Sequence, residues 1–146
     1  MQRSIQDSQR VIEQCGYYLL HPNQANFNPD LDVVHFVVDD EHVKANELPV
    51  RTLIQMLDGS KEKRLVLYNS LATERIQVVT VRLSHFNVRV VNERSQAVKV
   101  QVSPVFTTIH QVSTSEFDIS FIASISPLGM TTYTISAFDG TLHENT

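Results

Sequence analysis

The chain has 146 residues, of which 42% are hydrophobic and 19% charged, a balance that predicts one folded domain rather than a disordered polypeptide. The formal net charge is -4, and the scattered Lys and Arg residues offer no basic face for nucleic acid. There is no run of about 18 apolar residues, so the sequence predicts no membrane span. The single cysteine, Cys15, excludes an internal disulfide.

The first expected element is a helix from about Ser4 to Leu20. Its apolar side chains recur at the three-to-four spacing of one helical face, at Ile5, Val11, Ile12, Cys15, Tyr18 and Leu19. Pro22 is expected to end the helix, because residues before a proline disfavour the α conformation. A single helix before a β-domain either lies against the sheets or is the last helix of a bundle. On the apolar face, Cys15 is expected to be a buried, inert thiol.

Residues 23–63 are expected to form a linker with short strands. The β-branched apolar run at 33–38 predicts one strand, which ends at the adjacent acids Asp39, Asp40 and Glu41. A second short strand is expected at 51–57, before a polar turn that contains Gly59.

From Arg64 onward the sequence alternates between apolar and polar residues, which is the period of a half-buried strand. Strands are expected at 64–68, 76–83, 87–91, 97–102, 105–112, 117–125 and 131–135. In the strand at 97–102, Val98, Val100 and Val102 are expected to face one side. Seven short strands joined by turns predict an antiparallel β-sandwich. The predicted fold class is therefore mainly β, an antiparallel β-sandwich preceded by one α-helix.

The only candidate metal ligands close together in the sequence are His35, Asp39, Asp40 and His42. Zinc needs ligands that converge on one point at about 2.0–2.2 Å. Here the acids follow a predicted strand and the spacing matches no zinc motif, so a solvated acidic turn is the favoured interpretation. The sequence assigns no metal-binding residue.

Catalytic residues are not assigned either. There is no Gly-x-Ser-x-Gly nucleophile motif and no glycine-rich phosphate loop. The acids Glu74, Glu93, Glu116 and Asp118 are all expected at solvated strand or turn positions. Several aromatic side chains could line a sugar or protein site, namely Tyr17, Tyr18, Tyr68, Tyr133, Phe86 and Phe106. Most are expected to pack in the core or between domains, with Phe86 the best candidate for an exposed contact.

A series of motifs resembles the first β-domain after the helical bundle in glycoside hydrolase family 38, in particular the Golgi α-mannosidase II type. In order, these motifs are Arg64–Arg75 (with Tyr68-Asn69-Ser70-Leu71), Val78–Arg82, Asn87–Val91, Val100–Phe106, Phe117–Phe121 and Pro127–Gly129, followed by Tyr133. The segment Met1–Leu20 is similar to the last helix of that bundle. Two departures are Ser70, where the family has the proline of Asn-Pro-Leu, and Phe106, where it tends to have tryptophan.

The resemblance implies a retaining exo-α-mannosidase whose zinc ion and Asp nucleophile lie in an N-terminal α/β domain. None of those residues has a matching position here. We therefore expect a non-catalytic C-terminal fragment of such an enzyme, whose parent trims mannose from N-glycans in the Golgi lumen rather than the lysosome. Its expected partners are the parent's catalytic and helical domains, with no nucleic acid. No signal peptide is expected in the polar segment Met1–Asp7.

The resulting domain prediction is a terminal bundle helix at 1–22, a linker at 23–63, the sandwich at 64–137 and a tail at 138–146. The alternative function is a free-standing β-sandwich that binds a glycan or a protein. The reading frame upstream of Met1 separates the two hypotheses, because only the first expects an encoded zinc-binding domain there.

Overall fold

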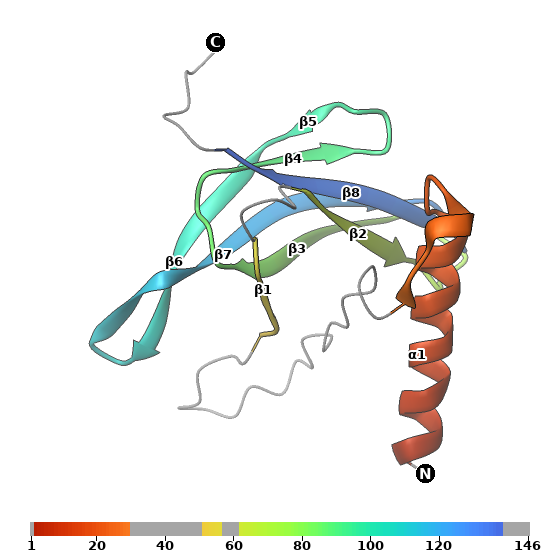
Figure 1. The fold of residues 1–146 in the computed structure, drawn as a ribbon, viewed down its shortest axis with the longest axis horizontal. Helices are drawn as coiled ribbons and strands as arrows, with labels where there is room; N and C mark the ends of the chain where they lie inside the picture. The colour runs from red at the N-terminus through yellow and green to blue at the C-terminus, as the bar shows by residue number, and fades with distance from the viewer. Residues whose placement is uncertain (1, 30–50, 57–61, 139–146) are drawn as a thin grey trace.

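The computed structural model describes residues 2–29, 51–56 and 62–138, with side chains from Asp7 onward except that of Gln9. The helix α1 (Gln2–Leu19) precedes two stacked β-sheets and is followed by a short 3-10 helix, Gln24–Asn26 (Figure 1). Within these residues no helix is long and apolar enough to cross a membrane. The predicted class, a mainly β sandwich of antiparallel-rich sheets after one helix, is confirmed.

Sheet A contains four strands in the order β1-β3-β7-β6. These are β1 (Leu53–Ile54), β3 (Arg75–Leu83), β6 (Val100–Thr108) and β7 (Gln111–Ile125). The long strand β7 pairs antiparallel with β3 along the whole of β3 and with β6 on its other side. The short β1 pairs in parallel with the end of β3.

Sheet B contains the other four strands in the order β2-β8-β4-β5. These are β2 (Glu62–Tyr68), β4 (Val88–Asn92), β5 (Ala97–Val98) and β8 (Met130–Ala137). All of its pairings are antiparallel. Because β2 and β3 lie in different sheets, as do β7 and β8, the chain crosses between the sheets at both of these connections.

Alternating side chains from both sheets fill the core between them. In β7, Ile119 and Ala123 are fully buried, whereas Ile122 is 62% exposed on the outer face, which confirms the predicted alternation. Sheet B contributes a matching set from β2, β4 and β8. The buried core comprises Ile54, Leu65, Val81, Leu83, Val88, Val90, Ile119, Phe121, Ala123, Tyr133 and Ile135. Apolar burial of this kind stabilises a fold by about 25 cal/mol per Å² of surface removed from water.

Two of the predicted strands are wrong in their extent. The strand expected at 97–102 is divided, because β5 pairs with β4 in sheet B while β6 begins at Val100 in sheet A. As a result Val98 and Val100 pack on the core, but Val102 is 45% exposed. The strand expected at 105–112 instead contains a hairpin turn at residues 109–110, after which β7 starts at Gln111.

The segment before the sandwich matches the prediction in part. Of the strand expected at 51–57, only Leu53–Ile54 pairs with a neighbour. The backbone N–H of Met56 instead donates to the hydroxyl of Ser84 at 2.9 Å, which ends the short strand. The strand predicted at 33–38 lies outside the described residues.

Candidate functional site

The contact between α1 and sheet B places the last turns of the helix against the outer face of the sheet. Gly16 and Tyr17 are buried there, and the Tyr17 hydroxyl donates to the backbone oxygen of Arg64 at 3.2 Å. The Arg64 guanidinium in turn donates to the backbone oxygen of Leu20 at 3.1 Å. These reciprocal bonds fix the end of the helix on β2.

Gly16 allows the helix backbone to approach the strands closely. A Cβ atom at this position would lie 3.3 Å from Met130 Sδ and 3.4 Å from Val66 Cγ1. The side chain of Val66 comes from β2 and that of Met130 from β8, so the helix lies across both strands. The sequence analysis did not identify Gly16 as a contact residue. A glycine inside a predicted helix, directly before two tyrosines, could have indicated a close approach to another element.

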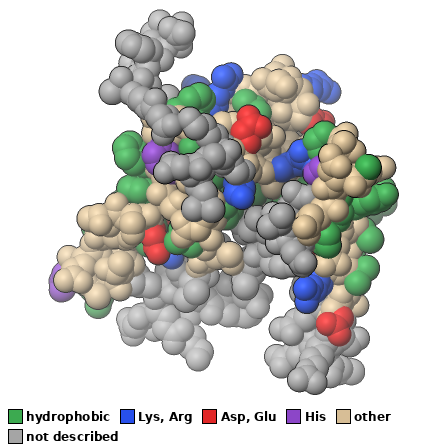
Figure 2. All heavy atoms as spheres, viewed as in Figure 1, with side chains coloured by type: hydrophobic (Ala, Val, Ile, Leu, Met, Phe, Trp, Pro, Cys, Tyr) green, Lys and Arg blue, Asp and Glu red, His purple; other side chains and the backbone are tan. Residues whose placement is uncertain are grey.

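The apolar helix face that the sequence predicted points away from the sandwich. We call the described part of it the helix stripe: Val11, Ile12, Cys15 and Leu19. At 3.6 residues per turn these positions lie on the side of α1 opposite Tyr17. Val11 is 58% exposed and Leu19 is 62% exposed, and Figure 2 shows hydrophobic side chains along the outer edge of α1.

The prediction of a buried thiol is wrong, because Cys15 is exposed. The physical reason is that the sheet contacts the helix through Gly16 and Tyr17, so the apolar stripe is left facing outward. Tyr18 is also 44% exposed, and its ring meets Phe27 edge-on with centroids 5.6 Å apart. Exposed apolar surface of this kind is typical of an interface.

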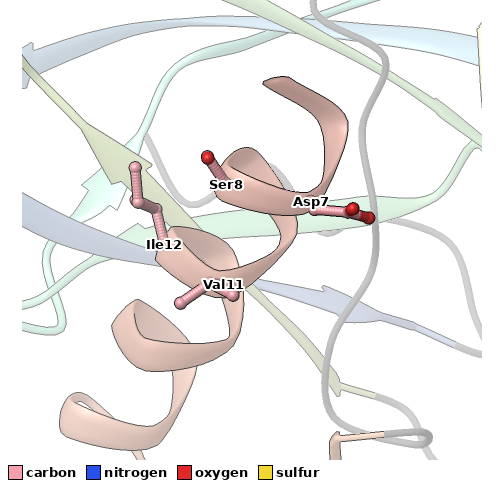
Figure 3. A pocket seen from close by; sticks show the side chains of 4 residues that line it. All are labelled: Asp7, Ser8, Val11 and Ile12. Atoms are coloured by element: carbon pink, nitrogen blue, oxygen red, sulfur yellow. The ribbon is translucent and has the colours of Figure 1, made fainter. Parts of the chain in front are cut away.

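An open depression on α1 is lined, among the described residues, by Asp7, Ser8, Val11 and Ile12. In Figure 3 the side chains of Ser8 and Ile12 point to one side of the helix and Asp7 points away from them. One carboxylate and one hydroxyl that point apart do not form a nucleophile and base pair. The depression is therefore part of the exposed apolar surface of α1.

The motif residue Asn69 is buried and holds two sheet crossings together. Its side-chain nitrogen donates to the backbone oxygens of Thr73 at 2.8 Å, Ile125 at 3.2 Å and Ser126 at 3.1 Å. Its side-chain oxygen accepts from the N–H of Leu71 at 3.0 Å. Asn69 is only 2% exposed, so these bonds form away from water.

Backbone bonds reinforce the same junction. The N–H of Asn69 donates to the oxygen of Gly129 at 2.9 Å, and the N–H of Leu128 donates to the oxygen of Leu71 at 2.9 Å. Leu128 has a positive φ of 49° in this turn. Two of the motifs that carry the family resemblance, around Asn69 and around Gly129, therefore meet in space and have a structural role.

Asp118 is not a solvated surface acid as predicted. Its carboxylate accepts two bonds from the Arg82 guanidinium, from Nε at 2.9 Å and from NH2 at 3.2 Å. A second guanidinium, that of Arg51, lies with its Nε 3.6 Å from Asp118 Oδ2. The side chains of Arg82 and Asp118 are 12% and 16% exposed. Directly opposed positions in β3 and β7 bring this ion pair together.

Two of the other three acids, Glu74 and Glu93, accept hydrogen bonds from hydroxyl groups on strands β7 and β8. Glu74 accepts a bond from the Ser124 hydroxyl at 2.7 Å, and Glu93 accepts one from Thr131 at 3.4 Å. Among residues 2–29, 51–56 and 62–138, no three His, Cys, Asp or Glu side chains converge as metal ligands. These residues therefore do not fit a zinc site. The cluster of His35, Asp39, Asp40 and His42 lies outside the described residues.

The aromatic candidates divide between core and surface. Tyr17 and Tyr133 are buried, whereas Tyr68 and Phe106 are exposed. The predicted exposure of Phe86 is confirmed at 58%. Its ring stacks on His85 with centroids 5.7 Å apart and meets Phe117 edge-on at 5.3 Å.

No family model matches the chain. It is 28% identical over 133 residues to alpha-mannosidase 2 of Rattus norvegicus, an alignment that covers 91% of this chain. It is 31% identical over 150 aligned positions to alpha-mannosidase 2 of Drosophila melanogaster, with 95% of the chain covered. A shorter match, 33% over 100 residues, is to alpha-mannosidase 2 of Spodoptera frugiperda.

The chain spans only 12–13% of the length of the rat and fly proteins. The predicted resemblance is confirmed: the chain is related to one segment, about an eighth in length, of the alpha-mannosidase 2 proteins.

Proposed function

We propose that the chain is a non-catalytic segment of a family 38 α-mannosidase, in which it acts as a structural support for the catalytic part. The observation that carries this proposal is the match over nine-tenths of the chain to only 12% of alpha-mannosidase 2. The parent enzyme would hydrolyse α-mannosidic bonds of N-glycans in the Golgi lumen. Its zinc ion would lie in a region that this chain does not match.

The outward helix stripe supports the domain assignment. An amphipathic helix normally turns its apolar face to a core, but in α1 the apolar residues point away from sheet B, on which its last turns lie. We infer that residues 1–22 are the last helix of a bundle supplied by the parent, and that 64–137 is the sandwich domain, followed by a tail at 138–146. Residues 23–63 would be a linker with short strands, of which β1 and the first residues of β2 join the sheets. The partners of this chain would be the helical and catalytic domains of that parent.

A graft tests this proposal. The chain replaces the matched segment of Drosophila alpha-mannosidase 2, and secreted yield and hydrolysis of an aryl α-mannoside are measured. The graft is expected to fold and to retain turnover. Replacing Ile12 and Leu19 in the graft with aspartate is expected to reduce the yield at least tenfold, because two charges would enter the proposed helical core.

The matched control is Ile109→Asp, which introduces the same charge at a residue that is 84% exposed on the distant hairpin. It should leave yield and turnover unchanged. A graft in which the Ile12 and Leu19 substitutions behave like this control would refute the proposed bundle contact. A graft that never folds, although the isolated chain does, would refute the proposed equivalence of the segments.

A second candidate function is a free-standing sandwich that binds a glycan or a protein. The observation that favours it is the exposed Phe86, which Phe117 and His85 hold in place at one end of the sandwich. Exposed aromatic rings stack on sugars and on protein side chains. A glycan array screened with the wild type and with Phe86→Ala tests this function, and binding is expected to be lost in the variant. The control is Ile109→Ala, which removes an exposed apolar side chain from the β6–β7 hairpin and should leave binding unchanged.

A further inference from the structure

On the side of sheet A where β1 lies, strand β3 has an edge that is mostly unpaired in the part of the chain that the structure describes. The pairing with β1 involves only Arg82 and Leu83 of β3. Among the described residues, no strand pairs with Arg75–Val81 on that side. The other side of β3 is paired with β7 throughout. Seven residues of this nine-residue strand therefore have no partner on that side within the described part of the chain.

The direction of the backbone groups along this edge follows from one hydrogen bond. The N–H of Ser84 donates to the oxygen of Ile54 in β1 at 3.2 Å, so Ser84 points toward the β1 side. Backbone groups alternate in direction along a strand. The N–H and C=O of Ile76, Val78 and Thr80 therefore also point to the β1 side, into the open edge.

The edge lacks the features that normally prevent strands from pairing with other chains. Edge strands are usually protected by proline, lysine, bulges or inward charges. Arg75–Val81 contains none of these apart from the terminal Arg75. Ile76 and Val78 are 70% and 60% exposed, and Val78 lies directly opposite the exposed Ile122 of β7. The open edge is therefore bordered by an exposed apolar strip.

We propose that this edge pairs with the same edge of a second copy of the chain, antiparallel, about a two-fold axis through Val78. The segment Arg75–Val81 is centred on Val78, so it can pair over its full length with the same segment of the second copy. The pairing ends at Arg82, where β1 occupies the edge. A symmetric antiparallel pair of this kind requires the axial residue to direct its N–H and C=O outward, as Val78 does. Such self-complementary contacts are typical of two-fold dimers.

The side chains in this arrangement are compatible with the pairing. Ile76 of one copy would lie opposite Thr80 of the other, and the two Val78 side chains would face each other on the outer face. The exposed strips of the two copies, each formed by Ile122 and Val78, would become continuous. Cross-strand pairs of β-branched residues stabilise a sheet, and the only charge within the paired segment, Arg75, would lie at its ends.

The test measures the mass of the intact chain by sedimentation velocity over a hundredfold range of concentration. The wild type is expected to shift from 16.6 kDa toward twice that mass. Val78→Pro removes an N–H that points away from β7, so it should keep the fold while raising the concentration needed for dimers at least tenfold. Val78→Thr keeps both the N–H and the branched shape, and should dimerise like the wild type.

Other outcomes decide against the proposal. A wild-type chain that stays at 16.6 kDa throughout contradicts it. So does a dimer that survives Val78→Pro but is lost in Ile12→Lys, which would assign the contact to the helix stripe. If Val78→Pro does not fold, Val78→Lys replaces it, because two lysines on the axis repel each other and should give the same loss of dimer.

Hydrogen exchange provides a second readout that does not depend on substitutions. Slower exchange at the amides of Ile76, Val78 and Thr80 is expected as the concentration rises through the dimer range. The amides of α1 should not change over the same range. Exchange at the three edge amides that is independent of concentration, in a sample that does dimerise, would place the contact elsewhere.

Discussion

The side-chain amide of Asn69 donates a 3.1 Å hydrogen bond to the backbone oxygen of Ser126, which joins the end of β2 to the turn after β7. Two crossings between the sheets are thereby held at one buried point. Further bonds to Thr73, Ile125 and Leu71 satisfy the remaining groups of the same amide. A buried, fully bonded side chain of this kind specifies the conformation of both loops.

Asn69→Ala should lower the free energy of unfolding by about 2–3 kcal/mol, because the three carbonyl oxygens and the Leu71 N–H would lose a buried partner. Chemical denaturation measures the change. The control is Asn92→Ala, which removes a side chain that also bonds local N–H groups, of Arg94 and Gln96, but at an exposed site. It should cost less than about 1 kcal/mol. Equal effects at the two positions would contradict the structural role of Asn69.

The docking of α1 should depend on Gly16 and Tyr17. Gly16→Val would place a branched side chain against Met130 and Val66, which already lie 3.3 and 3.4 Å from an added Cβ. Tyr17→Phe removes the bond to the Arg64 oxygen and should cost about 0.5–1.5 kcal/mol of docking. Limited proteolysis within α1 is the measurement, and faster cleavage is expected in both variants, most strongly in Gly16→Val. Unchanged cleavage would show that the helix does not dock through these residues.

The helix stripe should limit the solubility of the isolated chain. Replacing Ile12 and Leu19 with glutamine is expected to raise solubility and leave the unfolding midpoint of the sandwich unchanged, because neither side chain is buried. Removing residues before Asn23 should have the same effect on solubility. Light scattering over a concentration series measures solubility, and thermal denaturation measures the unfolding midpoint of the sandwich. A sandwich that unfolds after either change would show that α1 is part of its core.

The ion pair of Arg82 and Asp118 should contribute more than an exposed pair does. Both side chains are mostly buried and the contact is bidentate, a geometry that favours a strong charge-assisted interaction. A double-mutant cycle with Arg82→Met and Asp118→Asn should give a coupling energy of about 1–3 kcal/mol. Because Arg51 also approaches Asp118, the cycle repeated in an Arg51→Met background should give a changed coupling. A coupling energy near zero in both backgrounds would show that this ion pair contributes no more to stability than an exposed one.

Much of the sandwich follows from the sequence because its strands alternate clearly. The fully buried Ile119 and Ala123 and the exposed Ile122 lie on the faces that the pattern predicted. The alternation gave a wrong prediction around Lys99, because it continues from β5 into β6 although the chain passes there from sheet B to sheet A. The sequence pattern therefore does not reveal that one strand ends and another begins. It also missed the turn at Ile109 and His110, because neither residue is a typical turn former.

The candidate site was less predictable, for a different reason. Apolar spacing identified the stripe on α1, but spacing alone does not say whether a sheet or another helix covers that face. The helix meets the sheet through Gly16 and Tyr17 instead, so Cys15 is exposed where burial was expected. Asp118 gave the converse error, because its partner Arg82 is distant in the sequence and only strand pairing brings the two together.

A turnover assay of the purified chain tests whether it supports an α-mannosidase without carrying out the chemistry itself. An aryl α-mannoside is incubated with the chain and added zinc, and with the chain after treatment with a chelator. No release of the aryl group above the background of the buffer is expected in either sample. Turnover that rises in proportion to the amount of chain and is abolished by the chelator would contradict it.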